Sequence, residues 1–554
     1  MYKIKNNLLM LLTLALVLVT SCQDLDEVNI NPNGVDPATA DLNLLLPTIE
    51  TGIGNAVVNL GFGDLAGVMQ HTQKDGWSSG HNDYAWNNAN QSWSGYYGIL
   101  RNNDAFYQKA VAGGFAFHEG IALVMKSFTF GLITDLWGDA PYTEALQGDQ
   151  GPDHFKPVYD DQQAIYMGIL ADLETANTLL SQAQGSYLNI DAAQDIIYHG
   201  DVAKWRKFAN SLALRYYMRI SVKDPSAAAA GIGKITANPA TYPLILDSSE
   251  DANIDYVGTS PSDSWPSNTV FDPNPSSGAY MRLKMCSTLV EVLQGLDDPR
   301  LGVYANKVGT PLVLVPDASG LDETIDGKRY VSQDVVDALY TKEELLFAVP
   351  DYDPEYVGLT PSFIAGPIYN MQPDVAQAVF NPHASQLNDI FMESTGDLLK
   401  MRIMSAAEVH FILAEAALNS WGPGSPEGHY ASGVQESMKS WGVGDAAGDY
   451  LAGAPYSGLE SIIMQKWIAS WTAAAESWFD YRRTGIPDLQ TGTLARRTAL
   501  PLRFYYHFES EISLNPENAE AAIEKLQTTE FTGIDTKNSA WSKSWLLQGT
   551  GKPY

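Results

Sequence analysis

The chain has 554 residues, of which 45% are hydrophobic, and its 65 acidic against 34 basic residues give a formal net charge of -31. The apolar fraction is typical of a folded globular protein, and so acidic a chain repels phosphate backbones, which excludes nucleic acid as a partner. Only two cysteines are present, Cys22 and Cys286, which excludes a disulfide scaffold and any cysteine-rich metal centre.

Residues 1–21 have the pattern of a lipoprotein signal peptide. Lys3 and Lys5 precede the apolar run Leu8–Val19, which is too short to span a hydrocarbon core of ~30 Å as a helix. The run leads into Val19-Thr20-Ser21-Cys22, which resembles the bacterial lipobox, so Cys22 is expected to be lipidated and to anchor the mature protein to a membrane. An ordinary secretory signal with a chance cysteine is the alternative. If Cys22 carries lipid, Cys286 has no intramolecular partner and is expected to be a buried free thiol.

An extended, turn-rich lead-in is expected over residues 22–47, followed by three parts. Residues 48–225 have apolar side chains three or four positions apart, which predicts packed helices, the last of them capped by Asp201 and ended by Asp224-Pro225. Residues 226–403 are rich in Pro, Gly, Ser, Asp and Asn, which predicts long loops with a few short strands and helices. Residues 404–554 return to a helical pattern.

Two features stand out in this last part. Ser405 and Glu408 have the spacing of a capping box, in which each side chain accepts a hydrogen bond from the backbone of the other residue. Apolar residues from Ile463 to Tyr481 predict one long helix, which Arg482-Arg483-Thr484-Gly485 would end. The whole pattern predicts a mostly α-helical, single large body with a loop-rich face and a few short strands.

No catalytic signature is present in the sequence: HExxH, GxSxG, the Walker loop and the kinase motifs are all missing. A glycosidase needs only two carboxylates, and no such pair can be selected among 65 acidic residues. The cluster Asp247, Glu250, Asp251 and Asp255 offers oxygen atoms that calcium prefers, but it lacks EF-hand spacing, which favours a solvated loop. We therefore predict no catalytic residues, no cofactor and no metal site, and bound calcium stays open as an alternative.

Aromatic residues gather in two polar, turn-rich segments, residues 75–98 and 256–280. Rings among amide and carboxylate groups suit a site that stacks on the C–H faces of sugars and hydrogen-bonds their hydroxyls. The alternative is that rings anchor loops to helices, which we expect for at least half of them, and first for Trp93, Tyr96 and Tyr97. The predicted ligand-binding residues are Trp77, Asn82, Asp83, Trp86, Tyr256, Asp263 and Trp265.

Five segments, in order, resemble motifs of the SusD/RagB-type nutrient-binding outer-membrane lipoproteins of Bacteroidetes. They are Asp135–Ala145 (DLWGDAPYTEA), Trp205–Arg215 (WRKFANSLALR), Ser405–Leu418, Gln465–Gly485 and Pro501–Asn515. In the last segment His507 replaces the usual proline after tyrosine. The acidic stretch Asp24–Glu27 after Cys22 also resembles a surface-export signal of Bacteroidetes lipoproteins. With the lipobox, the resemblance covers nearly the whole mature chain.

This resemblance implies tetratricopeptide-like helix pairs in one domain over residues 48–554, supporting a loop-rich ligand-binding face. It implies a lipid-anchored outer-membrane protein, facing the cell exterior, that is not an enzyme and delivers an oligosaccharide to a SusC-like TonB-dependent transporter. Some members handle peptides, so a peptide-binding protein of the RagB kind is an alternative, as are a surface glycoside hydrolase and a structural surface-layer protein. Buried charges in the helical stripes are expected to pair between helices, since an unpaired buried charge costs several kcal/mol. These charges are Arg215, Glu408, Glu415, Arg482 and Arg483.

Overall fold

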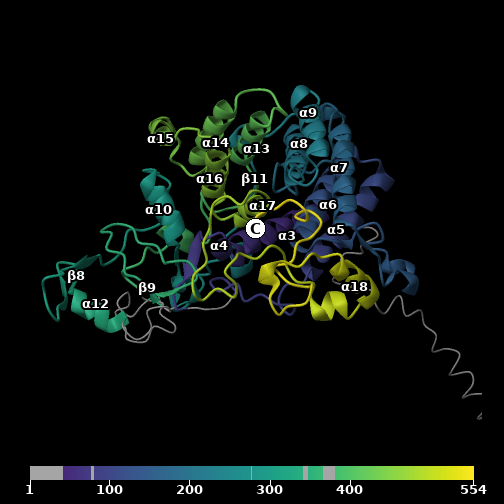
Figure 1. The fold of residues 1–554 in the computed structure, drawn as a ribbon. Helices are drawn as coiled ribbons and strands as arrows, with labels where there is room; N and C mark the ends of the chain where they lie inside the picture. The colour runs from purple at the N-terminus through teal and green to yellow at the C-terminus, as the bar shows by residue number, and fades with distance from the viewer. Residues whose placement is uncertain (1–40, 77–79, 276–277, 341–346, 366–380) are drawn as a thin grey trace, which may run out of the picture.

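The computed structural model of the protein describes residues 41–76, 80–275, 278–340, 347–365 and 381–554. The predicted signal peptide, the predicted lipidation residue Cys22 and the predicted ligand residue Trp77 lie outside the described residues. Helices dominate and the strands are short (Figure 1), which confirms the mostly α-helical fold class.

The first helical part builds up from neighbouring helices that pack side by side from α5 to α9. Its helices are α3 (Leu46–Gly61), α4 (Asp64–Val68), α5 (Ser94–Gly113), α6 (Ala116–Trp137), α7 (Gln162–Leu179), α8 (Val202–Arg219) and α9 (Pro225–Ala237). α6 is long and apolar enough to cross a membrane, but 94% of its apolar window is buried inside the protein, as in the core helix of a globular body. The buried α6 is therefore the central support of this part.

Two aspartates set the bounds of α8 and α9. Asp201 caps α8 by accepting a hydrogen bond from the backbone N–H of Lys204 at 3.0 Å, as predicted. Asp224 accepts from the backbone N–H of Ala227 and Pro225 takes the first helical position, where its missing N–H costs nothing. The expectation of irregular chain directly after Pro225 is therefore wrong, because this pair begins α9 as well as ending the helix before it.

The second helical part contains α13 (Ala406–Leu418), α14 (Pro426–Ser440), α15 (Ala447–Gly453), α16 (Leu459–Ala469), α17 (Ala474–Thr484) and α18 (Pro516–Glu524). α13 packs against α14, α16 and also α8, so it joins the two helical parts. The single long helix expected over Ile463–Tyr481 is wrong: the backbone reverses at Thr472, whose φ is 68°, between α16 and α17. α17 ends at Gly485 with φ 78°, as predicted.

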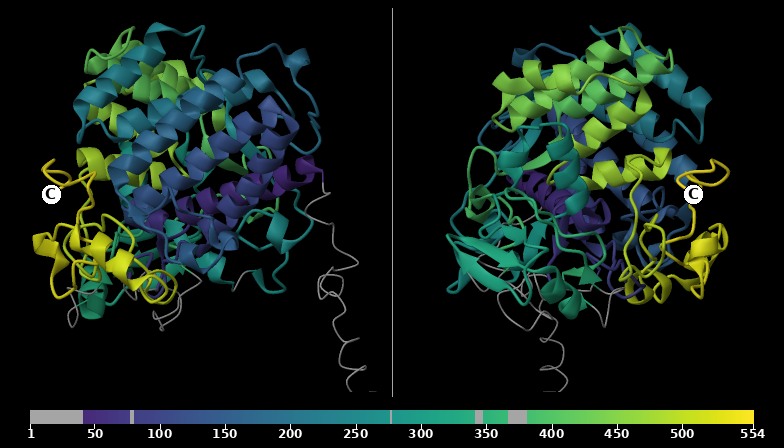
Figure 2. Two further views of the ribbon diagram at one scale, coloured as in Figure 1. Left: turned by 90° about the vertical axis from the view of Figure 1, so that its right-hand side faces the viewer. Right: turned by 60° about the vertical axis from the view of Figure 1, so that its left-hand side comes forward.

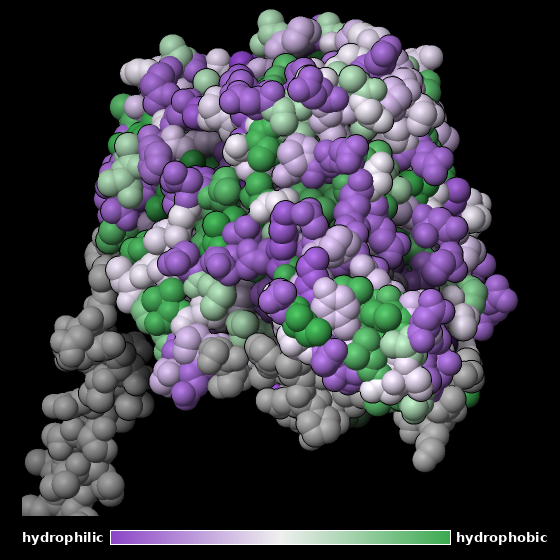
Figure 3. All heavy atoms as spheres, turned by 90° about the vertical axis from the view of Figure 1, so that its left-hand side faces the viewer, coloured by the Kyte–Doolittle hydropathy of each residue, from purple (hydrophilic) through white to green (hydrophobic). Residues whose placement is uncertain are grey.

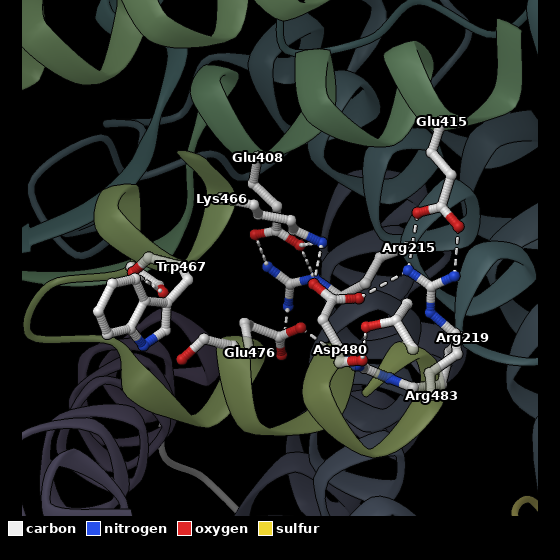
Figure 4. Close-up of polar contacts among 12 residues, drawn as sticks. Arg215, Arg219, Glu408, Glu415, Lys466, Trp467, Glu476, Asp480 and Arg483 are labelled. Atoms are coloured by element: carbon white, nitrogen blue, oxygen red, sulfur yellow. Dashed lines mark hydrogen bonds and ion pairs between the residues drawn. The ribbon is translucent and has the colours of Figure 1, made fainter. Parts of the chain in front are cut away.

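The helices meet over a buried network of charges (Figure 4). Arg215 of α8 donates to both carboxylate oxygens of Glu408 of α13, at 2.7 and 2.6 Å, and Arg483 of α17 pairs with Glu415 of α13. The network balances five cations against five anions, namely Arg215, Arg219, Lys466, Arg482 and Arg483 with Asp135, Glu408, Glu415, Glu476 and Asp480. The predicted pairing between helices is confirmed.

One of these pairs corrects the predicted capping box. The Ser405 hydroxyl accepts a hydrogen bond from the backbone N–H of Glu408 at 3.2 Å, which is the expected half of the motif. The Glu408 carboxylate, however, turns to Arg215 instead of to the Ser405 backbone. A buried guanidinium is a far stronger partner for a carboxylate than a neutral amide is, so the ion pair takes precedence.

In both views of Figure 2 most of the loop-rich middle, drawn in teal, lies at the end of the body away from α13–α16. Arg300 is an exception, because it donates hydrogen bonds to Ser437 of α14 and Gln465 of α16. Its helices are α10 (Ser287–Gly295), α11 (Leu301–Tyr304) and α12 (Gln333–Tyr340). A three-stranded sheet has β8 (Lys328–Val331) at its centre, parallel to β6 (Leu312–Leu314) and antiparallel to β7 (Asp322–Ile325). Two-residue strands pair as β2 (Ala140–Pro141) with β3 (Tyr159–Asp160) and as β9 (Phe347–Ala348) with β10 (Ile364–Ala365).

Two longer ladders attach this middle part to α3. β1 (Thr72–Lys74) runs antiparallel to β5 (Leu283–Met285), with Lys74 opposite Leu283, and β4 (Ala252–Asp255) runs antiparallel to β11 (Lys400–Met404). α3 packs against both β4 and β11. The loop between β4 and β5 is therefore fixed at both ends beside α3.

The face on the left of Figure 1 carries hydrophilic and hydrophobic side chains in small, interleaved groups (Figure 3). Such a mosaic is usual, because apolar atoms contribute more than half of the exposed area of folded proteins. The large aromatic side chains lie mostly elsewhere: ten of the thirteen tryptophans are buried in the core. The high tryptophan content therefore serves packing first.

Candidate functional site

A cavity of about 430 Å³ opens where the β4–β5 loop meets the end of α3. One wall comes from the second aromatic-rich segment, residues 256–280, and none comes from the first, residues 75–98. The β1–β5 ladder holds this wall beside Lys74. Asn59 and Phe62 come from the end of α3, and Lys74 comes from the end of β1. The remaining wall consists mainly of Asn268, Thr269, Asp272 and Tyr280 from the loop. We call it the Phe62–Tyr280 cavity.

Phe62 is a half-buried ring held from behind by two others. Its centroid lies 4.8 Å from that of Trp265 and 6.4 Å from that of Phe391. Both of these rings are fully buried in the core. Phe62 is thus a rigid apolar surface, of the kind on which the C–H face of a sugar ring can stack.

Tyr280 contributes a polar group that the fold leaves unsatisfied. Its hydroxyl is buried and has no hydrogen-bond partner among the described residues. Burial raises the pKa of this phenol above its ordinary value, helped by the nearby negative charge of Asp389, so the hydroxyl stays neutral. A buried hydroxyl without a partner costs roughly 1–3 kcal/mol.

Charged and polar groups of both signs complete the lining. Lys74 is half-exposed in the cavity wall, and Asp272 accepts a hydrogen bond from the backbone N–H of Asn274 at 2.8 Å. Gly278 packs closely on Asp272: a Cβ atom there would lie 2.6 Å from Oδ2, so a larger residue would have to displace the Asp272 carboxylate. Rings, amides, one cation and one anion together suit a neutral, polyhydroxylated ligand.

Two buried groups of opposite charge lie near this region. Asp75, next to Lys74, accepts a hydrogen bond from Asn381 at 2.7 Å, and Lys284 of β5 donates to Gln386. Burial raises the pKa of Asp75 to about 6 and lowers the pKa of Lys284 to about 8, and each shift is limited by the charge of the other residue. The two groups are thus fixed beneath the β1–β5 ladder.

Three of the predicted ligand-binding rings are in the core. Trp86 is 1% exposed and packs edge-on against Trp478 and Phe504, with centroids 5.9 and 5.2 Å away. Tyr256 and Trp265 are 7% and 1% exposed and contact each other at 5.8 Å. The expectation that these rings are exposed is wrong, because aromatic neighbours from distant segments cover them. Trp265 reaches the cavity only through Phe62.

The predicted polar partners hold their own loops in place. Asn82 is buried and exchanges two hydrogen bonds with the Lys74 backbone, at 2.9 and 2.7 Å, which fixes the end of β1. Asp83 accepts from the backbone N–H of Ala85 at 2.8 Å. Asp263 accepts from the backbone N–H groups of Thr259 and Ser260, at 2.9 and 2.7 Å. None of these three lines the Phe62–Tyr280 cavity.

The loop-anchoring alternative is confirmed for Trp93. It is 7% exposed, and its ring contacts those of Trp137 and Tyr159. Phe62 is the ring that sequence reasoning missed. It stands between two glycines directly after an apolar helix, and an aromatic residue in so open a turn is the signal that could have identified it.

The acidic cluster at residues 247–255 does not converge. Asp247 pairs with Lys439 at 2.8 Å, Asp255 pairs with Lys400 at 2.7 Å, and Asp251 accepts from the backbone N–H of Ala406. Within the described ranges, no three His, Cys, Asp or Glu side chains gather as a metal ligand set. Cys286 is a buried free thiol, as expected, and burial raises the pKa of its thiol to about 12.

A second, more enclosed cavity lies among the buried charges. It measures about 50 Å³ and is lined by Arg402, Glu408, Lys466 and Glu476, among others. The space is sufficient for one or more water molecules but not for a sugar ring. It belongs to the ion-pair network, which leaves the larger Phe62–Tyr280 cavity as the candidate ligand site.

Comparison with known proteins identifies a family. The sequence model of the SusD-like family, described as "Starch-binding associating with outer membrane", matches residues 38–330 and 355–507. These ranges include every residue that lines the Phe62–Tyr280 cavity. Among curated proteins, none matches the chain.

Solved structures share the fold over nearly the whole length. An outer-membrane protein of Bacteroides vulgatus with a suggested role in nutrient binding is 23% identical, with a TM-score of 0.69, and covers 92% of this chain and 100% of its own. A SusD homologue of Bacteroides fragilis is 21% identical, with a TM-score of 0.68 and coverages of 90% and 99%. A chitin-binding SusD homologue of Flavobacterium johnsoniae is 20% identical, with a TM-score of 0.66 and coverages of 91% and 99%.

Proposed function

The chain belongs to the SusD-like family of non-catalytic nutrient-binding proteins that associate with the outer membrane, and from this premise we propose that it captures an oligosaccharide for import. The Phe62–Tyr280 cavity is the proposed binding site. Delivery of the ligand to a SusC-like TonB-dependent transporter is part of the proposal.

The observation that carries the proposal is the pairing of a braced ring with an unsatisfied hydroxyl. Phe62 offers a flat apolar surface supported by Trp265, and Tyr280 offers a buried hydroxyl without a partner among the described residues. Sugars present apolar C–H faces and polar rims, so the two groups match the two sides of one pyranose ring. The volume of about 430 Å³ is in the range of sites for small ligands.

A peptide is the second candidate ligand. Lys74 and Asp272 place opposite charges in the same cavity, and such a pair could hold the charged ends or side chains of a short peptide. An oligosaccharide is favoured because the cavity also contains an aromatic surface and several neutral hydrogen-bonding groups, Asn59, Asn268 and Thr269 among them. The chitin-binding relative from Flavobacterium johnsoniae supports the same choice.

Lipid attachment at Cys22 is proposed from the sequence, where Val19-Thr20-Ser21 precedes the cysteine. The protein would be tethered to the outer membrane and face the cell exterior, with the transporter below it. Replacing Cys22 by alanine should release the protein from the membrane fraction. Unchanged membrane attachment of this variant would contradict lipidation at Cys22.

Calorimetry with the mature protein tests the ligand class. Neutral oligosaccharides and short peptides would be titrated into the wild type and into Phe62→Ala. The proposal expects saturable binding of at least one oligosaccharide that Phe62→Ala weakens, and binding of peptides alone would replace it with the second candidate. New reducing ends after incubation with polysaccharide, lost on substitution of one carboxylate, would instead indicate a glycosidase.

A further inference from the structure

A shallow groove of about 380 Å³ continues from the proposed binding site along α3. α3 contributes Gly52, Asn55 and Asn59 to it, and α5 contributes Gly95, Tyr96 and Ile99. Asn59 lines both this groove and the Phe62–Tyr280 cavity. We call this second space the Tyr96 groove, and it is continuous with the first at Asn59.

The geometry of α3 explains why the two spaces follow one another. Gly52, Asn55, Asn59 and Phe62 are three or four residues apart, so they lie on one face of the helix. Ten residues separate the ends of this stripe, a length of about 15 Å at 1.5 Å per residue. That distance exceeds a single sugar ring and accommodates a short chain of them.

The groove is closed at one end and open along its side. At Gly52 a Cβ atom would lie only 3.0 Å from the Ile99 side chain, which shows that α3 and α5 touch there. At Gly95 a Cβ atom would meet nothing within 4 Å, so the wall on this side leaves room for a ligand. Glycine at both positions thus shapes the groove.

The chemistry of the groove is neutral. Every side chain that lines it is uncharged, and Asn55 and Asn59 carry amides that can both donate and accept hydrogen bonds. Tyr96 is half-buried, and its ring is held edge-on against Trp137 with centroids 5.6 Å apart. An anionic sugar would find no cation here and would also be repelled by the net charge of -31.

We infer that the ligand is an uncharged oligosaccharide that extends from the Phe62–Tyr280 cavity, past Asn59, into the Tyr96 groove. The inference rests on the proposed function and adds the length, direction and charge of the ligand. The cavity anchors one end of the chain, and the groove binds the sugars that follow.

Affinity as a function of chain length tests the inference. The probes are neutral chitooligosaccharides and maltooligosaccharides of two to seven residues, titrated by calorimetry into the wild type and into Gly95→Trp. The indole would fill the open side of the groove without a clash of its Cβ atom. Gly448→Trp is the matched control, since Gly448 is an exposed glycine of α15 whose Cβ also meets nothing within 4 Å and which lies outside both spaces.

The inference expects affinity to rise with length in the wild type and in Gly448→Trp. Gly95→Trp should bind the shortest oligomers as the wild type does and the longest about ten-fold more weakly, which is 1.4 kcal/mol. Asn55→Ala, a smaller change at a half-buried position, should weaken only the longer oligomers. Oligogalacturonate of matched length should bind neither variant nor wild type.

Each other outcome has a distinct meaning. The same length dependence in Gly95→Trp and Asn55→Ala as in the wild type would overturn the inference and leave the proposed function intact. Tighter binding of oligogalacturonate than of the neutral series would overturn the neutral character of the ligand. Failure of every oligosaccharide to bind the wild type would overturn the proposed function, and the inference with it.

Discussion

Trp265 and Phe62 lie with their ring centroids 4.8 Å apart and their planes inclined by 58°, so that the buried indole supports the ring that faces the cavity. Phe62 presents its ring to the cavity, and Trp265 holds that ring in place. A ring held in this way loses little conformational entropy when a ligand stacks on it.

Replacing Phe62 by alanine should therefore weaken oligosaccharide binding by about 1–3 kcal/mol, by analogy with the aromatic anchors of other interfaces. Calorimetry measures the change in dissociation constant. Phe62→Tyr, which keeps the ring, is the control and should retain most of the affinity. Equal affinities for Phe62→Ala and the wild type would show that the ligand binds elsewhere.

Replacing Trp86 by alanine should act on stability instead of on binding. The indole is buried between Trp478 and Phe504, so its removal leaves a cavity and should lower the free energy of unfolding by about 3–5 kcal/mol. Urea denaturation measures this change. A Trp86→Ala protein with wild-type stability and weaker sugar binding would restore Trp86 as a ligand residue.

Breaking the buried ion pair between Arg215 and Glu408 should also destabilise the protein. Glu408→Leu leaves the buried Arg215 guanidinium without its main partner and should cost about 3–5 kcal/mol of unfolding free energy. The double change Arg215→Met with Glu408→Leu should lower the unfolding free energy by less than Glu408→Leu alone. The reason is that the double variant has no buried guanidinium at position 215 left without its partner.

The exposed pair Lys307–Glu355 provides the comparison. Its atoms are also close, at 2.7 Å, but both side chains are more than half exposed. Glu355→Leu should change the unfolding free energy by less than about 1 kcal/mol, because water already solvates both charges. Similar losses of unfolding free energy in Glu408→Leu and Glu355→Leu would contradict the expectation that burial makes the first pair more important for stability.

The buried His71 should lower the stability of the folded state in acid. His71 donates to the backbone carbonyl of Trp467 at 3.2 Å, and burial lowers the pKa of its ring to about 3. Between pH 6.5 and 3 the unfolded chain binds a proton at this residue that the folded chain does not. The folded state therefore loses up to about 1.4 kcal/mol per pH unit over this window.

His71→Gln removes this proton linkage and should lessen the fall in unfolding free energy between pH 6.5 and 4. Urea denaturation at several pH values gives the slopes. Burial raises the pKa of Asp75 to about 6 and that of Glu511 to about 7, so protonation of these two groups stabilises the folded state as the pH falls. The slope of the variant must therefore be compared with that of the wild type, which contains the same two groups. Parallel slopes for variant and wild type would contradict the assignment.

Much of the fold could be predicted from local sequence. The caps at Asp201 and Ser405 and the glycine after α17 are short-range signals, and the structure has each of them in place. The break at Thr472 was missed because the apolar pattern continues across it and nothing nearby in the sequence stops a helix.

The site was harder to predict because burial depends on distant partners. Trp86 and Phe62 both stand in polar, turn-rich sequence, yet residues 478 and 504 cover Trp86, whereas Phe62 remains half-exposed at a cavity. The glycines on both sides of Phe62 are a local signal, but they do not show which distant residues cover either ring. Sequence identified one segment that lines the site, residues 256–280, but it did not identify Phe62 or show which rings are covered.

The β1–β5 ladder joins Thr72 to Met285, which are far apart in the sequence. It therefore builds the proposed pocket from two segments that are synthesised at different times. The segment with β1 is synthesised well before the segment with β5. Closing the large loop between them is slow and entropically costly. We therefore expect the binding site to form late in folding, and a short fragment of the chain would not form it.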